Sequence, residues 1–175
     1  MRHAETVSAT RRAQHAHQTS RYWVENGQTY VSTAEGWLLD PESSSAYGRN
    51  AHLQRSNELA HERCLVLLGE PGMGKSTIAA DKTALVPDLF NGVVVNFDLG
   101  GYSSEDRLAR DLLEDDRITR WRNSEHEMCL LLDGFDEALS RIENLPKLIL
   151  SWLRKVDCAR MYVRIFCRTA DWRHV

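Results

Sequence analysis

From residue 64 onward, short apolar runs alternate with longer amphipathic runs. This alternation is typical of βαβ units that form a parallel sheet. Four apolar runs predict strands, and they are CLVLL (64–68), VVVNF (93–97), MCLLL (128–132) and YVRIFC (162–167). The first and third runs are apolar throughout, as strands covered by helices on both faces are. We therefore expect these two strands in the middle of the sheet.

Two stretches between the strands carry patterns that start helices. Ser103 and Asp106 have the spacing of a capping box ahead of an apolar stretch. Pro146 suits the first turn of a helix. Six apolar residues around it recur at helical spacing, namely Leu145, Leu148, Ile149, Trp152, Leu153 and Val156. We expect the face that they form to pack on the sheet.

The part of the chain before residue 64 lacks this regular alternation. We divide the chain into an arm at 1–21 that we expect to be disordered, an N-terminal extension at 22–63 and an α/β core at 64–175. Within the extension we expect short strands around the Asn26-Gly27 turn, at 22–24, 30–31 and 37–39, and a short helix at 57–62.

Charge and composition narrow the class of protein. The net charge of -3 over 175 residues gives no basic field, so binding of nucleic acid is not expected. No apolar run approaches the length of a membrane span, and the N-terminus lacks the apolar middle of a secretory signal, so we expect a cytoplasmic protein. The four cysteines show no CxxC spacing and are expected to be buried free thiols.

The segment GEPGMGKST follows the first predicted strand and opens a predicted helix at 76–84. It fits the phosphate-binding pattern G-x-x-x-x-G-K-[ST]. The candidate nucleotide-binding residues are Gly69, Glu70, Pro71, Gly72, Met73, Gly74, Lys75, Ser76 and Thr77. The alternative is a glycine-rich turn before a helix that happens to expose a lysine.

The residue types of this loop match phosphate chemistry. Its glycines let the backbone approach phosphates without side-chain clashes. Lys75 is expected to reach the β- and γ-phosphates, and the hydroxyl of Ser76 to bind Mg²⁺. Thr77 is expected to touch the α-phosphate.

A second motif, LLLDGFDEA, spans residues 130–138. Its acids could simply stabilise the start of a helix through the helix dipole. Because ligands of open α/β sheets bind at the carboxyl ends of the strands, Asp133 is also expected to face the same crevice as Lys75 and to hold Mg²⁺ through water. Asp136 and Glu137 are the candidates for orienting or deprotonating the attacking water.

Together, LVLLGEPGMGKST and CLLLDGFDEAL resemble the NACHT class of STAND signal-transduction ATPases, over about residues 36–175. The resemblance implies that the α/β core at 64–175 is a partial P-loop NTPase core with a three-layer fold, which binds ATP with Mg²⁺ and alternates between ADP and ATP states. It also implies a larger signalling or defence protein that assembles with itself or with protein partners. By the same resemblance, Glu137 is the base, Asp136 a supporting acid and Arg168 the sensor of the γ-phosphate.

Members of this class continue with a fifth strand, beside the first, and a helical lid. Since the sequence ends at Val175, we expect an incomplete NTPase module, truncated after the sensor strand, that binds nucleotide weakly and hydrolyses it slowly. The strand at 64–68 would then form an open apolar edge, unless the segment at 22–39 covers it.

Other functions remain open from the sequence. The first alternative to an ATPase is a nucleotide-gated interaction module with little or no turnover. A nucleic-acid-stimulated motor is disfavoured by the acidic balance, and a P-loop kinase by the second acid, which suits activation of water. The motifs alone do not decide between adenine and guanine. The absence of the Asn-Lys-x-Asp guanine motif from the sequence, together with the resemblance to NACHT-class ATPases, favours ATP.

Overall fold

The computed structural model of the chain describes residues 22–32, 38–39, 41, 50–81 and 85–172. The chain divides into two compact units, 1–53 and 54–175, and each is described by itself. The predicted arm at 1–21 lies outside the described residues. Among the helices of the described part, none combines the length and the apolar character that a membrane span requires.

The first unit contains strand β1 (Tyr22–Trp23) and the predicted turn. The turn is confirmed, because the amide of Gln28 donates to the carbonyl of Glu25 at 3.1 Å and Gly27 has a φ of 92°, which favours glycine. Residues 30–31 do not form the predicted strand, and Trp37 lies outside the described residues.

A buried asparagine organises the rest of this unit. The side chain of Asn50 accepts from the amide of Val31 at 2.9 Å and donates to the carbonyls of Val31 and Leu39. Asn50 is completely buried, so these bonds replace the water that its amide loses. They hold two separate stretches together beside the isolated bridge between Ser32 and Leu38.

The second unit, which we call the α/β unit, is built on four parallel strands. Its strands are β2 (Gln54–Arg55), β3 (Cys64–Leu68), β4 (Gly92–Asp98), β5 (Glu127–Asp133) and β6 (Met161–Cys167), of which β3 to β6 form the sheet. Its helices are α1 (Ser56–Leu59), α2 (Lys75–Ala80), α3 (Glu105–Glu114), α4 (Asp116–Arg122), α5 (Phe135–Leu139), α6 (Leu145–Leu153) and α7 (Thr169–Trp172). Two 3-10 turns complete it, η1 (Leu99–Gly101) and η2 (Cys158–Arg160).

The order of the sheet is β3-β6-β5-β4, with every neighbouring pair parallel. All four predicted strands are therefore confirmed, and the unit is an α/β fold with a parallel sheet. The third predicted strand, β5, is internal as expected. The expectation of a middle position is wrong for the first strand, because β6 inserts between β3 and β5. The other expectation for residues 64–68, an edge position, is confirmed within the described sheet.

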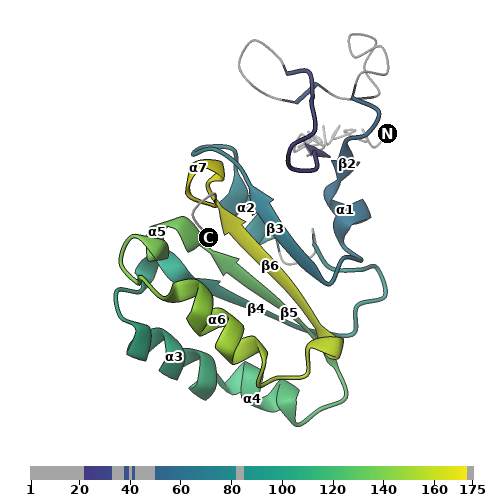
Figure 1. Cartoon of the computed structure of the whole chain (residues 1–175). Coiled ribbons are helices and arrows are strands. Elements are labelled where there is room, and N and C mark those ends of the chain that lie inside the picture. The colour runs from purple at the N-terminus through teal and green to yellow at the C-terminus, as the bar shows by residue number, and fades with distance from the viewer. Residues whose placement is uncertain (1–21, 33–37, 40, 42–49, 82–84, 173–175) are drawn as a thin grey trace, which may run out of the picture. The chain divides into compact units, whose positions relative to one another are not determined.

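Helices cover both faces of the sheet (Figure 1), with α3, α4 and α6 on one side and α2 on the other. The main apolar core lies on the α3–α6 side, where alternate residues of β4, β5 and β6 pack against these helices. Leu145, Ile149 and Trp152 are buried in it, so the predicted packing face of α6 is confirmed. In Figure 1 the arrows of the strands point toward the end at which α2, α5 and α7 lie.

Several helix boundaries differ from the predictions. The capping box of Ser103 and Asp106 is wrong, since α3 begins at Glu105 and Ser104 is its N-cap, without a side-chain hydrogen bond. Helix α4 was not predicted. It begins directly after Asp115, whose carboxylate accepts from the amides of Arg117 and Ile118.

The remaining short helices are confirmed in part. Helix α1 ends at Leu59, earlier than the predicted 57–62 segment. Helix α2 ends at Ala80, and residues 82–84 of the predicted helix lie outside the described residues.

The cysteines divide into two pairs by burial. Cys129 and Cys167 are buried free thiols, as predicted. Cys64 and Cys158 are free but exposed, so the expectation of burial is wrong for them. Cys64 begins the edge strand β3 and Cys158 lies in the turn η2, where helices do not cover them from both sides.

Arg164, in the internal strand β6, has no exposed surface. Its guanidinium donates to the carbonyls of Ala60 at 2.8 Å, Glu62 at 2.7 Å and Leu85 at 3.1 Å. Burial lowers the pKa of Arg164. Backbone carbonyls from before β3 and after α2 thus solvate a charge inside the fold and tie these two segments to the sheet.

Candidate functional site

The two sequence motifs lie at the same end of the sheet, the one formed by the carboxyl ends of its parallel strands. The loop Gly69–Gly74 follows β3, Asp133 ends β5 and Arg168 follows β6. The amide of Gly69 donates to the carbonyl of Cys167 at 3.2 Å, which extends the β3–β6 pairing past Leu68. The start of the loop therefore lies directly beside Arg168.

The loop has the backbone that its glycines permit. Gly72 and Gly74 have φ values of 80° and 77°, in the left-handed region that favours glycine. Helix α2 begins immediately afterwards with Lys75. The ammonium of Lys75 folds back over the loop and donates to the carbonyls of Gly69 and, at 3.0 Å, of Glu70. The loop and its lysine therefore form one compact structure.

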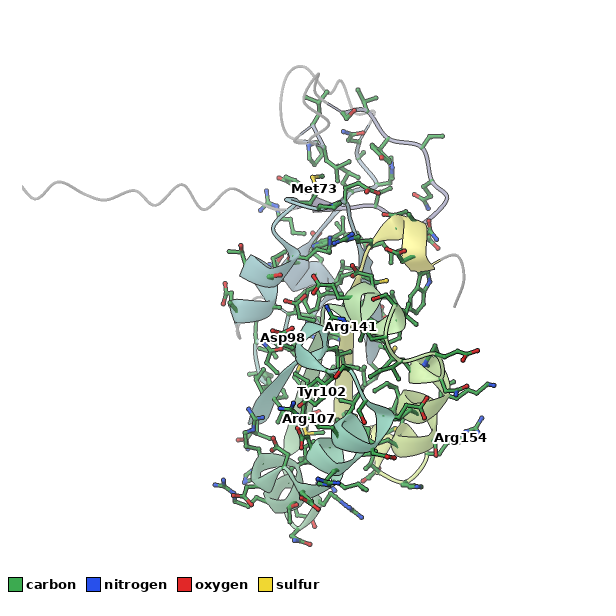
Figure 2. All side chains as sticks on the ribbon, turned by 90° about the vertical axis from the view of Figure 1, so that its left-hand side faces the viewer. Met73, Asp98, Tyr102, Arg107, Arg141 and Arg154 are labelled. Atoms are coloured by element: carbon green, nitrogen blue, oxygen red, sulfur yellow. The ribbon has the colours of Figure 1, made fainter. Side chains whose placement is uncertain are left out.

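The outer part of the loop faces solvent. Glu70, Pro71, Gly72 and Met73 are exposed, and Met73 lies near the upper end of the α/β unit in Figure 2. Ser76 and Thr77, in the first turn of α2, are exposed as well. Every polar group that the sequence assigns to phosphate or metal in this loop is accessible to a ligand.

Asp133 lies on the face of the sheet that α2 covers. Its strand neighbours Leu130 and Leu132 point into the core on the opposite face, so the alternation of β5 directs Asp133 to the α2 side. Helix α2 contacts both β5 and β6. One carboxylate oxygen of Asp133 accepts from the amide of Gly134 at 2.9 Å, and the acid is only partly buried.

These donors fit a shared magnesium site better than a site made by protein alone. Within the described ranges, no group of three or more His, Cys, Asp or Glu residues could hold a metal ion. Mg²⁺ is usually bound by one or two carboxylates together with phosphate oxygens and water. One hydroxyl at Ser76 and one carboxylate at Asp133, on the same face, match that arrangement.

Asp136 and Arg168 form an ion pair. Nε of Arg168 lies 2.9 Å from Oδ2 of Asp136, and the backbone amide of Arg168 donates to Oδ1 at 3.2 Å. The Asp136 side chain is 7% exposed, whereas that of Arg168 is 45% exposed. Both oxygens of a buried carboxylate are therefore committed to a single, partly accessible arginine.

Glu137 is exposed and has different surroundings. Its carboxylate has no hydrogen-bond or ion-pair partner in the described part of the chain, and it lies against η1, since a Cβ added to Gly100 would come within 2.5 Å of Oε2. The side chain of Arg141 donates to the carbonyl of Gly100, and Asp98 accepts from its amide at 3.1 Å. In Figure 2 the Arg141 side chain lies next to Asp98. The turn η1 thus packs against α5 beside Glu137.

Cys167 lies between the loop and the acidic motif and is fully buried. Burial, followed by the negative charges of Asp136 and Asp171, raises the pKa of Cys167 to about 11. The thiol is therefore protonated at neutral pH and is not a nucleophile of this site.

The sequence analysis did not identify η1 or Arg141. The pattern that could have found η1 is the acid at the end of VVVNFD, which places Asp98 at a strand end as LLLD places Asp133. Two hollows of the described surface lie along β4. One is lined by residues that include Asn91, Arg120 and Trp121, and the other by residues that include Tyr102, Asp111 and Glu114.

A comparison of the chain with protein-family models and with curated protein sequences gives no match. The resemblance to NACHT-type ATPases accordingly depends on sequence motifs alone. The α/β fold with a parallel sheet is compatible with that class, and many other proteins share such a sheet. Function has to be argued from the site.

Proposed function

We propose that the α/β unit binds ATP with Mg²⁺ and hydrolyses it slowly, as the nucleotide switch of a NACHT-like signalling protein with a three-layer P-loop fold. One observation carries the proposal. Lys75, Asp133 and Arg168 lie at the same end of the sheet, although each follows or ends a different strand. Their chemistry is complementary to a magnesium-bound triphosphate.

Each group has a distinct role in binding. The backbone of the loop Gly69–Gly74 surrounds the β-phosphate, and Lys75 exchanges its two carbonyl partners for β- and γ-phosphate oxygens. Thr77 contacts the α-phosphate. Ser76 and Asp133 hold Mg²⁺, which neutralises charge that develops on the phosphates.

Glu137 is the base in this proposal. A base must be able to accept a proton from water, and Glu137 is the exposed acid of the motif without a competing partner among the described residues. Since it stands on an open surface, water is poorly excluded and turnover is slow. Slow hydrolysis suits a switch that persists in one nucleotide state.

The direct test compares binding and turnover in three proteins. Wild type should bind an ATP analogue only with Mg²⁺ and release phosphate slowly. Lys75→Ala should lose binding, because the phosphates lose their cation. Glu137→Gln should bind normally and lose turnover. Wild type that binds no nucleotide at any Mg²⁺ concentration would exclude the proposal.

The second candidate is a nucleotide-gated interaction module with little or no turnover. The edge strand β3 favours it, because Leu65 and Val66 are only half-buried there and a partner strand could pair with them. Under this alternative, Glu137→Gln leaves nucleotide-dependent association with a protein partner, or self-association, unchanged. Loss of association in Glu137→Gln would favour the ATPase.

A further inference from the structure

The acid Asp136 has little surface left for water or metal. Its side chain is 7% exposed, one oxygen lies 2.9 Å from Nε of Arg168 in an ion pair, and the other accepts from the backbone amide of Arg168. A buried carboxylate needs a hydrogen-bonded cation, so withdrawing Asp136 from Arg168 would leave an unpaired charge inside the fold. Asp136 is therefore unsuited to act as base or as magnesium ligand.

The ion pair with Asp136 engages only the Nε side of the Arg168 guanidinium. A guanidinium presents its donors as a planar fork, and Asp136 takes the Nε side. Within the described residues, no hydrogen bond is found for its two terminal nitrogens, and 45% of the side chain is exposed. Holding Nε fixes the plane of the fork and leaves the outer donors to bind something else.

The position of this fork is set by the loop. The amide of Gly69 donates to the carbonyl of Cys167, the residue just before Arg168. Arg168 is therefore the residue next to the one that bonds Gly69, the first residue of the phosphate-binding loop. After Arg168 the chain forms α7, and Trp172 of this helix packs against Phe135 of α5, with their ring centroids 6.0 Å apart.

From this arrangement we infer that Asp136 is a positioning residue, which holds Arg168 through Nε so that its terminal nitrogens bind the γ-phosphate. This rests on the proposed function. It assigns the two acids of the motif separate tasks, since Glu137 acts on water while Asp136 acts only through Arg168. It also predicts that Asp136 matters for the distinction between ATP and ADP and not for binding of the shared phosphates.

The test measures the ratio of affinities for a non-hydrolysable ATP analogue and for ADP. Asp136→Asn keeps an acceptor for the backbone amide and removes the charge that orients Arg168. We expect the ratio to fall roughly tenfold, through weaker binding of the ATP analogue alone. Arg168→Gln should lower it as much, and the double variant no further, because both act through one contact. The matched control is Asp157→Asn, which removes the acid of the Asp157–Arg160 pair on η2 and should leave the ratio unchanged.

Arg168→Lys covers the case in which Asp136→Asn does not fold. A lysine keeps a cation for Asp136, so the fold persists, but one ammonium cannot serve the acid and the phosphate in the same planar geometry. We expect a reduced ratio again. A ratio that stays constant or rises in Asp136→Asn or in Arg168→Lys overturns the inference while ATP binding stands. Wild type that binds neither nucleotide overturns the proposed function itself, and the inference with it.

Discussion

Asp98 and Asp133 end two neighbouring parallel strands and lie opposite each other in the register of β4 and β5. The two acids nevertheless differ in their surroundings. Asp98 is exposed at the end of the edge strand and caps η1, where it accepts from the amide of Gly100. Asp133 is partly buried at the end of an internal strand that α2 contacts. Of the two acids, Asp133 is the one whose strand lies against α2, the helix that begins with Lys75 and Ser76.

The pair therefore supplies a matched test of the magnesium site. Asp133→Asn should weaken Mg²⁺-dependent binding of an ATP analogue by about tenfold or more, because a carboxylate that bonds a cation contributes roughly 1.5–3 kcal/mol. Asp98→Asn should change it by less than about twofold, since its role is the turn. Titrations of nucleotide at several Mg²⁺ concentrations measure both. Equal losses in the two variants would remove Asp133 from the metal site.

Gly100 and Gly101 form a second matched pair. A Cβ at Gly100 would stand 2.5 Å from Oε2 of Glu137, whereas at Gly101 it would meet nothing within 4 Å. Because the Glu137 side chain is exposed, it can move aside, and Gly100→Ala should displace the base without unfolding the protein. We expect kcat for ATP to fall roughly tenfold with nucleotide affinity unchanged.

Gly101→Ala serves as the control for the same backbone change in η1. Steady-state phosphate release and nucleotide binding distinguish the two effects. If both alanine variants keep the kcat of the wild type, Glu137 is not the base, or η1 does not position it.

The strands of the α/β unit could be predicted because local sequence determines them. Each apolar run corresponds to a strand within one or two residues, and Pro146 marks the first turn of α6. The order of the strands could not be predicted in this way. An apolar run such as CLVLL has the same composition at an edge as in the middle, and pairing with β6 depends on residues about a hundred positions away.

The candidate site shows the same division. The phosphate loop and the acidic motif are each one continuous segment directly after a predicted strand, so their positions at strand ends could be predicted. The Asp136–Arg168 pair joins residues 32 positions apart through the parallel alignment of β5 with β6. The buried bonds of Arg164 likewise join distant segments, and an arginine inside an apolar strand gave no indication of its partners.

Arg164 provides a test of the fold that is independent of nucleotide. Arg164→Leu would leave the buried carbonyls of Ala60 and Leu85 and the partly buried carbonyl of Glu62 without their donor. Each unsatisfied buried group costs about 1–3 kcal/mol, so we expect the free energy of unfolding to fall by about 3–5 kcal/mol. Urea unfolding followed by circular dichroism measures this change.

The control for Arg164 is Arg63→Gln. Both arginines lie over the ring of Tyr162, and the guanidinium carbon of Arg63 is 4.3 Å from the ring centre. The ion pair of Arg63 with Glu127, however, is exposed to solvent. Exposed pairs contribute about 0–1 kcal/mol, so the loss should stay within that range. Similar losses in the two variants would show that Arg164 contributes no more than a surface arginine.

Asp115 links the stability of α4 to pH. Hydrogen bonds from the Arg117 side chain, against a smaller opposing effect of burial, hold the pKa of Asp115 below its ordinary value of 3.8. Because the folded-state pKa is the lower one, the stabilisation is fully present above the ordinary value and is lost as the pH falls through the folded-state pKa. The acid also caps α4 through the amides of Arg117 and Ile118, and such a cap contributes about 1 kcal/mol.

Asp115→Asn replaces this acid by a side chain that caps the helix equally well and does not titrate. The variant should be slightly less stable than wild type near neutral pH, and the difference should disappear as the pH falls through the folded-state pKa, which lies below 3.8. Asp116→Asn, one residue on, keeps the cap and should retain the difference between neutral and acidic pH that wild type shows. Urea unfolding across this pH range measures all three proteins. A stability difference between wild type and Asp115→Asn that persists at the lowest pH would show that the effect of Asp115 does not arise from its charge.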